Sequence, residues 1–448
     1  MSNLFESMVT HESAVINRCY EKRTDKIGAY RMIHNTKVDI SSLIERLQEN
    51  CVEHLHSSHV LCIEDTTELN YTNLTGRLKK DDPEVGPMSK NSNRGFFCHP
   101  TLVIDAKTRV PAGYSYIRLW NRSSEKKDKH SRKYHHQRIQ DKESYRWIES
   151  AQKSALALPK SVTKTIIADR ESDIYEALFE IPRQGCELLI RSSANRQLDK
   201  ENLCLLEKMQ SLESRYSYEL QVKGNHSRKT RTALMELRYG RVRLSKPSTA
   251  GADCPKTLDI NCIYMVEKGT VPSNESPIEW RLLTTHPIDS IQEVLQCVEW
   301  YKCRWYIEEV FRLLKSKGLD VESAQLEDGE TLKKMVSLAL VVALHLLSLK
   351  ISYDKEDQQT PALVAFTPLQ IELLKVLLKM TEGKTAKQKN PFKKESLAWA
   401  AWIIARLGGW DGYKSQGPPG YITFRKGLEK FWTHFRLFQF VNKDVYKE

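Results

Sequence analysis

The sequence predicts a mixed α/β protein with an inserted antiparallel β-subdomain and a helical C-terminal domain. Up to about residue 200, short apolar β-rich runs alternate with helical segments, which is typical of a mixed sheet. Alternating apolar and polar residues fill about 200–285, and helical periodicity dominates beyond Ser290. We therefore expect a short N-terminal segment over 1–55, a core over 56–330 and a helical domain over 331–448.

The first half of the core is predicted from β-rich runs that end in turns or acids. Two of these runs, HVLCIED and KTIIAD, share one pattern, in which an apolar strand ends in an aspartate. The expected strands and the helix between the last two runs lie at 59–65, 101–120 (two strands), 164–169, 171–180 (the helix) and 186–192. The order is that of a mixed sheet.

Helices are predicted after the insertion. Ser290 and Glu293 form a potential capping box, and the helical pattern that follows runs to Gly318. The longest apolar run, VSLALVVALHLLSL at 336–349, contains His345 and is too short to span a bilayer. We interpret it as a buried helix and expect no membrane association.

Composition narrows the class of protein. The 448 residues include 69 Lys and Arg against 57 Asp and Glu, a net charge of +12 that favours a polyanionic partner, nucleic acid first. The ten cysteines form no CxxC or CxxH pair, which argues against a structural zinc site, and they do not indicate a disulfide scaffold. The first residues contain no apolar signal core, so we expect a reduced, cytoplasmic setting.

The stretch YKCRWYIEEVFRLLK at 301–315 has an unusual polar side. On a helix, Tyr301, Arg304, Glu308 and Lys315 fall within roughly 60° of one another, with Arg312 inside or beside the same stripe. A buried apolar face on the other side would project a carboxylate, cations and a phenol together. The alternative is a solvated face with an ion pair between Arg304 and Glu308.

Three carboxylates suggest metal chemistry. Asp65 and Asp169 each end an apolar β-run, where ligands of α/β sheets gather. Neighbouring carboxylates repel unless a cation neutralises them, and hard oxygen ligands favour Mg²⁺ or Mn²⁺. With Glu308, three acids are sufficient to hold two ions that act on a phosphodiester. Taken singly, each aspartate also fits a turn or a helix cap.

Together, these blocks resemble a known enzyme family. IEDTTELNY around Asp65, ADRESDIYEAL around Asp169, and the spacing of Tyr301, Arg304, Glu308 and Lys315 are similar to the three catalytic blocks of bacterial DDE transposases. The resemblance is greatest to the cut-and-paste insertion sequence four family, which is defined by its Y-R-E-K signature. It extends from about Gly28 to the ARLGGW segment at 405–410.

The resemblance implies a ribonuclease H-like catalytic core interrupted by a β-insertion before the last acid. It implies that Asp65, Asp169 and Glu308 bind two Mg²⁺ or Mn²⁺ ions, with no other cofactor. Water would nick one strand of double-stranded DNA at a transposon end, and the freed 3′ hydroxyl would form a hairpin. Reopening the hairpin and joining the end to target DNA would complete the reaction, in a homodimer that pairs two ends.

Further residues gain roles from the resemblance. Trp280 would support a base that leaves the DNA stack, and Arg191, Tyr301, Arg304, Arg312 and Lys315 would contact DNA phosphates. From the residues alone, Trp280 also fits core packing and Arg191 an exposed strand end. The segment at 121–138 holds seven Lys or Arg. It fits a basic loop near DNA, a solvated loop, or a metal site of His130, His135 and His136.

Both ends of the chain leave alternatives open. Only 27 residues precede GAYRMIHN at 28–35, fewer than the family's end-recognising domain has, so a DNA-binding role for 1–55 competes with its loss. The aromatic-rich segments at 396–410 and 427–441 either pack on the core or pair with a second copy. Two other functions fit the chain: an inhibitory DNA-binding relative, and a ribonuclease H-like nuclease without strand transfer.

Overall fold

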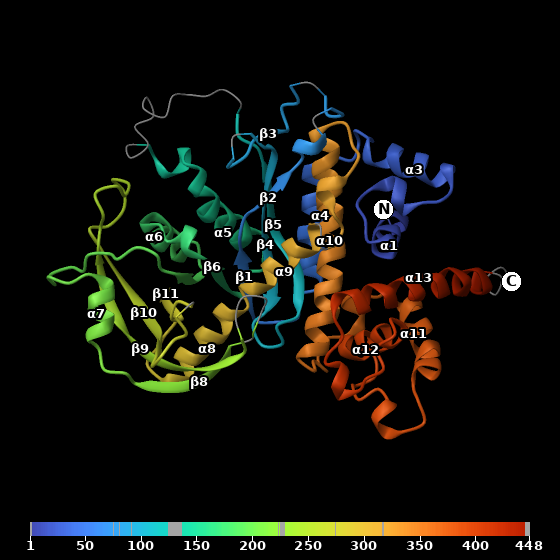
Figure 1. Ribbon diagram of the computed structural model, residues 1–448. Coiled ribbons are helices and arrows are strands. Elements are labelled where there is room, and N and C mark those ends of the chain that lie inside the picture. Colours follow the sequence, from blue (N-terminus) through green and yellow to red (C-terminus); the bar gives the residue numbers. More distant parts are fainter. Residues whose placement is uncertain are drawn as a thin grey trace. The chain divides into compact units, whose positions relative to one another are not determined.

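The computed structural model of the chain divides into two compact units (Figure 1). The first, here called the helical unit, comprises Met1–Ser57, Thr66–Lys126 and Trp305–Glu448. The second, the sheet unit, comprises Ser58–Asp65 and Lys127–Arg304. The structure describes residues 2–74, 76–79, 81–90, 92–123, 137–222, 224, 229–273, 275–315 and 318–443.

A mixed sheet forms the second unit. Its strands are β1 (His59–Glu64), β6 (Thr163–Ala168), β7 (Glu187–Arg191), β8 (Tyr216–Val222), β9 (Arg231–Ser245), β10 (Thr257–Lys268) and β11 (Glu279–Thr284). They are ordered β1-β6-β7-β11-β10-β9-β8. The pairs β1–β6 and β6–β7 are parallel, and β7–β11 is antiparallel. The predicted strands at 59–65, 164–169 and 186–192 are confirmed, each within two residues of its predicted ends.

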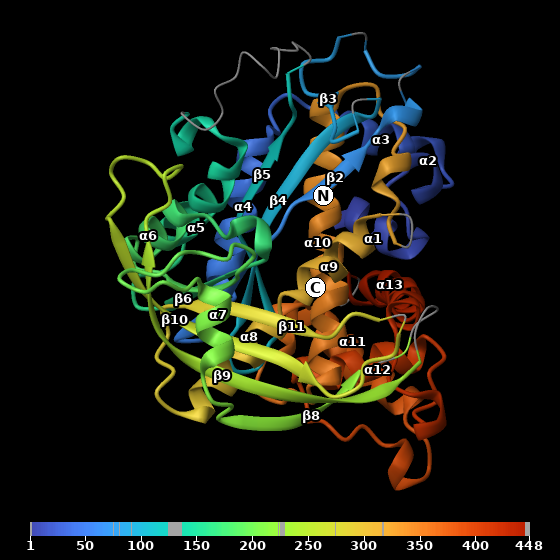
Figure 2. The ribbon, with the colours of Figure 1, turned by 60° about the vertical axis from the view of Figure 1, so that its left-hand side comes forward.

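The alternating sequence at about 200–285 forms the antiparallel strands β8 to β11. Figure 2 shows β8, β9 and β10 as long strands side by side. Because β11 pairs with β7, these strands continue the sheet that begins with β1. The region also contains one short helix that the alternating pattern did not predict, α7 (Leu205–Ser211).

Three longer helices complete the sheet unit: α5 (Arg146–Ala157), α6 (Tyr175–Arg183) and α8 (Ile291–Lys302). The predicted capping box is present, since Ser290 accepts from the Glu293 N–H and the Glu293 side chain accepts from the Ser290 N–H. The prediction of one helix to Gly318 was wrong. The N–H groups of Cys303 and Arg304 donate to carbonyls three residues back, and this tight turn ends α8 before the next helix starts at Trp305.

The strands of the helical unit are antiparallel neighbours of one long strand. They are β2 (Thr67–Asn70), β3 (Gly86–Pro87), β4 (Arg94–Asp105) and β5 (Pro111–Trp120), and β4 pairs with each of the other three. The two strands predicted at 101–120 correspond to the end of β4 and to β5. Nearly all of β4 is buried, which explains why its sequence is apolar without alternation.

Helices form the rest of this unit. They are α1 (Ser2–His11), α2 (Ile16–Cys19), α3 (Arg23–Ile33), α4 (Ile40–Glu53), α9 (Trp305–Leu314), α10 (Gly329–Asp354), α11 (Pro368–Thr381), α12 (Leu397–Leu407) and α13 (Tyr421–Lys443). Helix α1 packs against α10 and α13, and Phe5 makes an edge contact with Trp432 at 6.4 Å between ring centres. The first turn of the chain is thus tied to its last helix.

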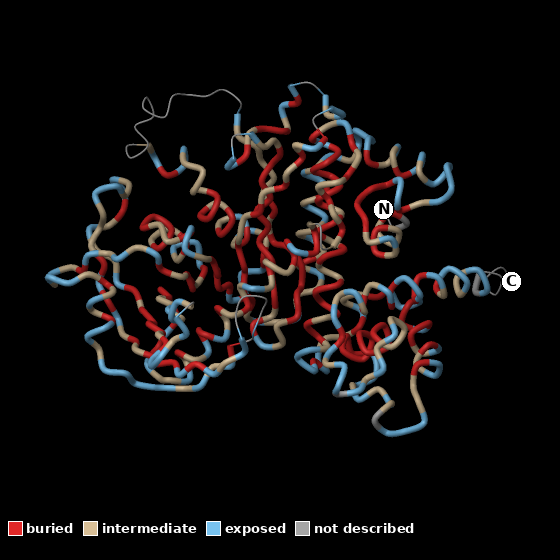
Figure 3. Tube along the Cα trace, viewed as in Figure 1, coloured by how far each residue is buried: buried red, intermediate tan, exposed pale blue. Residues whose placement is uncertain are grey.

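Helix α10 is longer than its apolar run predicted. Its 26 residues are long and apolar enough to cross a membrane, but 78% of the most apolar window is buried inside the protein. Asp328 caps its start, and the buried Lys333 pairs with Glu84 at 2.5 Å, so the helix extends over polar residues that the run left out. Figure 3 shows α10 as largely buried. The prediction of a buried helix is confirmed.

The aromatic side chains of the C-terminal helices are mostly internal. Trp399, Trp402, Phe431, Trp432 and Phe435 are each at most 4% exposed. The last part of α13 differs, because three of its apolar side chains are more than 60% exposed: Leu437, Phe440 and Val441. Packing inside the protein therefore accounts for most of this aromatic surface, and the end of α13 (pale blue in Figure 3) is exposed.

Candidate active site

Asp65 and Asp169 follow neighbouring parallel strands of the sheet unit. The register of β1 and β6 sets Ile63 opposite Ile167. Asp65 directly follows the last residue of β1 and Asp169 the last residue of β6, so both leave the sheet at the same ends of two paired parallel strands. Because adjacent strands lie about 4.8 Å apart, the two carboxylates belong to one edge of the sheet. The acid at the end of each apolar run thus reaches the position where α/β proteins gather ligands.

Arg304 is the partner of Asp65 in the sheet unit. Its Nη1 donates to Asp65 Oδ2 at 3.0 Å, and the two side chains are only 15% and 16% exposed. An arginine at this distance offsets the charge of the carboxylate, as a bound cation does. The stripe at 301–315 therefore brings at least one of its cations to the predicted carboxylates.

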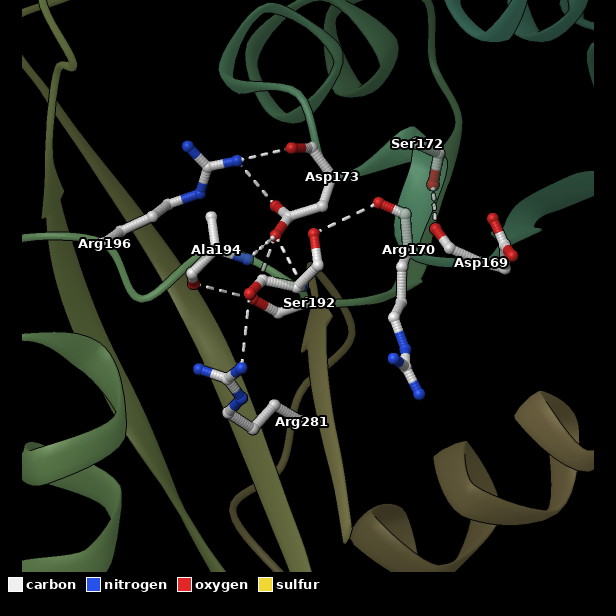
Figure 4. Close-up of polar contacts among 9 residues, drawn as sticks. Asp169, Arg170, Ser172, Asp173, Ser192, Ala194, Arg196 and Arg281 are labelled. Carbon is white, nitrogen blue, oxygen red and sulfur yellow. Dashed lines mark hydrogen bonds and ion pairs between the residues drawn. The ribbon is translucent and has the colours of Figure 1, made fainter. Parts of the chain in front are cut away.

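Asp169 caps the 3₁₀ turn that follows β6. Its Oδ1 accepts from the Glu171 N–H at 2.9 Å, and Ser172 Oγ donates to the Asp169 carbonyl at 2.7 Å. Across the described residues its other carboxylate oxygen has no hydrogen bond, and Figure 4 shows the carboxylate directed away from the neighbouring polar cluster. The capping alternative is thus correct for one oxygen, and the second is available to a ligand.

Arg191 and Trp280 lie at the same edge. The register of β6 and β7 sets Ala168 opposite Ile190, so Arg191 follows as the neighbour of Asp169. Arg191 Nη2 donates to the Glu279 carbonyl at 2.9 Å, and its guanidinium lies 5.9 Å from the centre of the Trp280 ring. Burial lowers the pKa of the Arg191 guanidinium. Arg191 is still a cation, because arginine is not deprotonated in proteins, and it lies against an aromatic face.

Tyr301 connects Trp280 to the cations. The two rings meet edge to face, with centres 5.2 Å apart. Tyr301 is 3% exposed, and burial raises the pKa of its phenol to about 12, although Arg304 and Arg191 lower it. The hydroxyl is thus protonated at neutral pH and can donate a hydrogen bond to an anion.

Glu308, Arg312 and Lys315 belong to the helical unit. Glu308 and Arg312 lie on α9, and Lys315 directly follows its last residue. Arg312 Nη2 donates to Glu309 at 2.6 Å and its guanidinium lies 4.9 Å from the Tyr421 ring centre. The interpretation of 301–315 as one continuous helical stripe was wrong, because the turn at Cys303 and Arg304 separates Tyr301 from these residues.

Several polar residues near this edge were missed by the sequence analysis. Glu64, one residue before Asp65, is fully buried, neither of its oxygens has a hydrogen bond within the described chain, and burial raises its pKa well above the usual range. An acid inside an apolar run was the available signal. Arg170, Asp173 and Arg281 were also missed. The partners of Asp173 lie on a distant segment, and nothing local shows that a donor of Arg281 lacks a partner.

The carboxylates at this edge of the sheet are the candidate ligands of a divalent metal ion. Among the described residues there is no group of three or more His, Cys, Asp or Glu that could hold an ion. Asp65 and Asp169 nevertheless offer hard oxygen atoms from adjoining strands, which suits Mg²⁺ or Mn²⁺. The alternative metal ligands His130, His135 and His136 lie outside the described residues. The donor set of the sheet edge therefore fits a hard cation held by two or more carboxylates.

Comparison with known protein families decides the class. The family model of the transposase DDE domain matches residues 77–344, more than half of the chain. The chain belongs to the transposase DDE domain family. Its function is that of a transposase, an enzyme that acts on DNA, and members of the family generally use divalent metal ions. The matched span includes Asp169 and Glu308 and begins after Asp65.

Proposed function

We propose that this transposase moves a bacterial insertion sequence by a cut-and-paste reaction and belongs to the insertion sequence four family with its Y-R-E-K signature. The observation that carries the proposal is the parallel pairing of β1 with β6, because Asp65 and Asp169 directly follow these two strands. The match to the DDE domain adds the enzyme class. A ribonuclease H-like core over 56–330, with the β-insertion at about 200–285, agrees with the mixed sheet of the second unit.

Asp65, Asp169 and Glu308 are the proposed metal ligands. Two Mg²⁺ or Mn²⁺ ions, when bound, would supply charge neutralisation for the attacking and leaving oxygens of a phosphodiester. Among the described residues, one carboxylate oxygen of Asp169 has no hydrogen bond, and the carboxylate of Asp65 would be shared between Arg304 and a bound ion. Arg304 would then also reach a DNA phosphate, which places a cation where negative charge develops.

The DNA contacts are proposed from the cations and aromatic rings of both units. Arg191, Tyr301 and Arg304 surround Asp169 and Asp65 in the sheet unit, and Arg312 and Lys315 follow Glu308 in sequence. Tyr301 donates from a protonated hydroxyl, whereas the arginines can make paired bonds to phosphate oxygens. Each of these groups binds negative charge without reading a base, so together they position the strand rather than choose its sequence.

Trp280 is proposed to stabilise a hairpin intermediate. Its ring is half-buried between Arg191 and Tyr301, so one part of its surface is packed and another is accessible. A base that leaves the stack during hairpin formation gains support from such a ring. A nuclease that only hydrolyses DNA has no use for this support, which is why hairpin products separate the transposase from the nuclease alternative.

Pairing of two copies is proposed to occur through the end of α13. Leu437, Phe440 and Val441 form an exposed apolar group at the end of the last helix, and exposed groups of this kind mark contact sites. A homodimer would allow two transposon ends to be held together. The helices of 1–55 would assist in DNA binding, and the protein would act in the cytoplasm, on the nucleoid when bound to DNA.

Cleavage of end-containing DNA tests the proposal. The substrate is a labelled duplex taken from the junction of the gene's flanking inverted repeat, incubated with the full chain and Mg²⁺. We expect a single-strand nick followed by a hairpin on a denaturing gel. Binding without any nick would support the inhibitory relative, and nicks without hairpins or joined products would support the nuclease.

A further inference from the structure

Three arginines line one cavity beside the candidate active site. The cavity, about 450 Å³ in volume, is bounded by Arg170, Arg191, Arg281, Ser193 and Trp280, together with Ser192 and 276–279. All of these residues belong to the sheet unit. Only one carboxylate, that of Glu279, is among them, and it interacts with the hydroxyl of Tyr264. The cavity therefore has a strongly positive lining.

None of the three arginines has a carboxylate partner in the described part of the chain. Arg170 is exposed, whereas Arg191 and Arg281 are half-buried. These two differ from most half-buried arginines that the structure describes in the sheet unit: Arg196 is paired with Asp173, Arg231 with Glu267, and Arg304 with Asp65. Cations kept close together without counter-ions repel one another, and an anion bound among them relieves the repulsion. Burial is the main cause that lowers the pKa of Arg191; Arg170 lowers it further, whereas Tyr301 and Asp169 raise it.

Arg281 points to the ligand most directly. Its Nη2 donates to the Ser193 carbonyl at 3.3 Å, which fixes the guanidinium, but its Nη1 is buried and has no hydrogen-bond partner. An unsatisfied buried donor costs free energy unless a ligand or water accepts from it. A phosphate oxygen in the cavity would accept this hydrogen bond.

The loop under the cavity is held rigidly by Asp173. Its carboxylate accepts from the Ser192 hydroxyl and from the N–H groups of Ser193 and Ala194 at 2.8 to 3.0 Å. Arg196 Nη2 donates to the other oxygen at 2.6 Å. Ser193 Oγ in turn donates to the Arg170 carbonyl at 3.3 Å. Figure 4 shows these bonds converging on Asp173, with the Arg170 guanidinium directed away from it.

We infer that Arg170, Arg281 and the loop at 192–194 form a second phosphate site, separate from Tyr301 and Arg304, that binds a backbone phosphate of a DNA strand. The inference rests on the proposed function for its ligand, because a positive cavity alone fits any phosphate. Asp173 is a positioning residue of this site. Arg191 stands between the two sites, since it neighbours Asp169 and also lines the cavity.

The test is the salt dependence of DNA binding by the full chain. The probe is a fluorescein-labelled 30-base-pair duplex of fixed mixed sequence, with the matching single strand as a second probe. The variants are Arg281→Ala, Arg281→Gln and Arg170→Ala. The control is Arg243→Ala, which removes an exposed arginine that pairs with Asp259 in the same sheet.

Loss of one phosphate contact makes the negative slope of log K against log salt less steep, by about 0.9 for duplex and about 0.7 for single strands. We expect this change and an affinity loss of about tenfold for the Arg281 and Arg170 variants, the size of a lost hydrogen bond to a charged group, and no change for Arg243→Ala. Arg281→Gln keeps packing and a donor, so it serves if Arg281→Ala is poorly folded. Unchanged slopes in folded variants would overturn the site.

Failure of the proposed function gives a different result. Asp169→Asn should abolish cleavage while keeping the wild-type slope, because it leaves the arginines in place. If the wild-type protein binds the duplex but does not cleave, the slopes still decide the phosphate site. Inorganic pyrophosphate serves as a competitor in the same assay. If the Arg281 variants change the salt dependence of this competition but not that of DNA binding, the cavity binds a free phosphate compound, and the assignment to DNA is wrong.

Discussion

Asp169 and Asp173 stand four residues apart in one segment, yet the structure treats them differently. The side chain of Asp173 is fully buried and its carboxylate accepts four hydrogen bonds, one of them from Arg196. Asp169 is half-buried as a residue, and its carboxylate accepts a single bond within the described chain, from the Glu171 N–H. A saturated carboxylate has no lone pair left for a metal ion, whereas a nearly free one has. Asp173 therefore stabilises the fold, whereas Asp169 can bind a ligand.

The largest expected effect on stability concerns Asp173. Asp173→Ala leaves Arg196 buried without its partner, which costs about 3 to 5 kcal/mol in unfolding free energy. Asp169→Ala removes only a cap, which costs about 1 kcal/mol. Urea denaturation of the two variants measures both values. Equal losses would show that the two carboxylates do not differ in role.

A matched control uses the ion pair of Arg231 and Glu267 in strands β9 and β10. Glu267 is 8% exposed, so Glu267→Ala breaks a similarly buried pair without touching the loop at 192–194. We expect a comparable loss of stability, with DNA affinity retained in the folded fraction. Asp173→Ala should lose both stability and DNA affinity.

The next effect is stabilisation by metal. A ligand of the native state at a hundred times its Kd adds about 2.7 kcal/mol to stability. We expect Mn²⁺ to raise the Tm of the wild-type protein and of Glu267→Ala, but not of Asp65→Asn or Asp169→Asn. Differential scanning calorimetry with and without Mn²⁺ measures this. A full shift in both aspartate variants would place the metal elsewhere.

Part of this contrast was readable in the sequence. The acids at the ends of two apolar runs predicted that Asp65 and Asp169 lie at one edge of the sheet. The Ser290 capping box predicted the start of α8. Nothing local distinguishes Asp169 from Asp173, because the partners of Asp173 lie about twenty residues away, on the loop at 192–196. Saturation of a carboxylate is a tertiary property.

Other differences have equally physical causes. Helical periodicity carried the predicted helix through Cys303, since a tight turn keeps similar spacing over one or two residues and leaves the pattern almost unchanged. Helix α10 exceeded its apolar run because Lys333 and Lys334 are buried with acidic partners, which hydropathy does not detect. Arg281 was missed because its importance depends on a missing hydrogen bond.

A smaller effect is expected at Trp280, which, like Asp169, is proposed to contact a ligand. Trp280→Ala should nick the first strand normally but form hairpins poorly, because stacking of a base on the ring contributes about 1 to 3 kcal/mol. Quantifying nicked and hairpin products on a denaturing gel checks it. A normal hairpin yield would assign Trp280 to packing against Tyr301 and Arg191.

The smallest effect on folding is expected at the end of α13, where exposed apolar side chains follow the buried part of the same helix. Changing Leu437, Phe440 and Val441 to Ser should alter stability by no more than about 0.5 kcal/mol, as for exposed sites, while abolishing complexes with two DNA ends. Phe431→Ala, in the buried part of the helix, should cost about 3 to 5 kcal/mol. Light scattering and gel shifts distinguish the two, and intact two-end complexes in the triple variant would refute pairing.

The most direct measurement of the central claim is the rate of first-strand cleavage at the transposon end in Mg²⁺. It compares Asp65→Asn, Asp169→Asn and Glu308→Gln with the wild-type chain, all at saturating DNA. Loss of several kcal/mol of transition-state stabilisation predicts rates lower by on the order of a thousandfold in each variant, with DNA affinity nearly intact. Cleavage at the wild-type rate by any of the three would contradict its role as a metal ligand, and by all three would contradict the proposed active site.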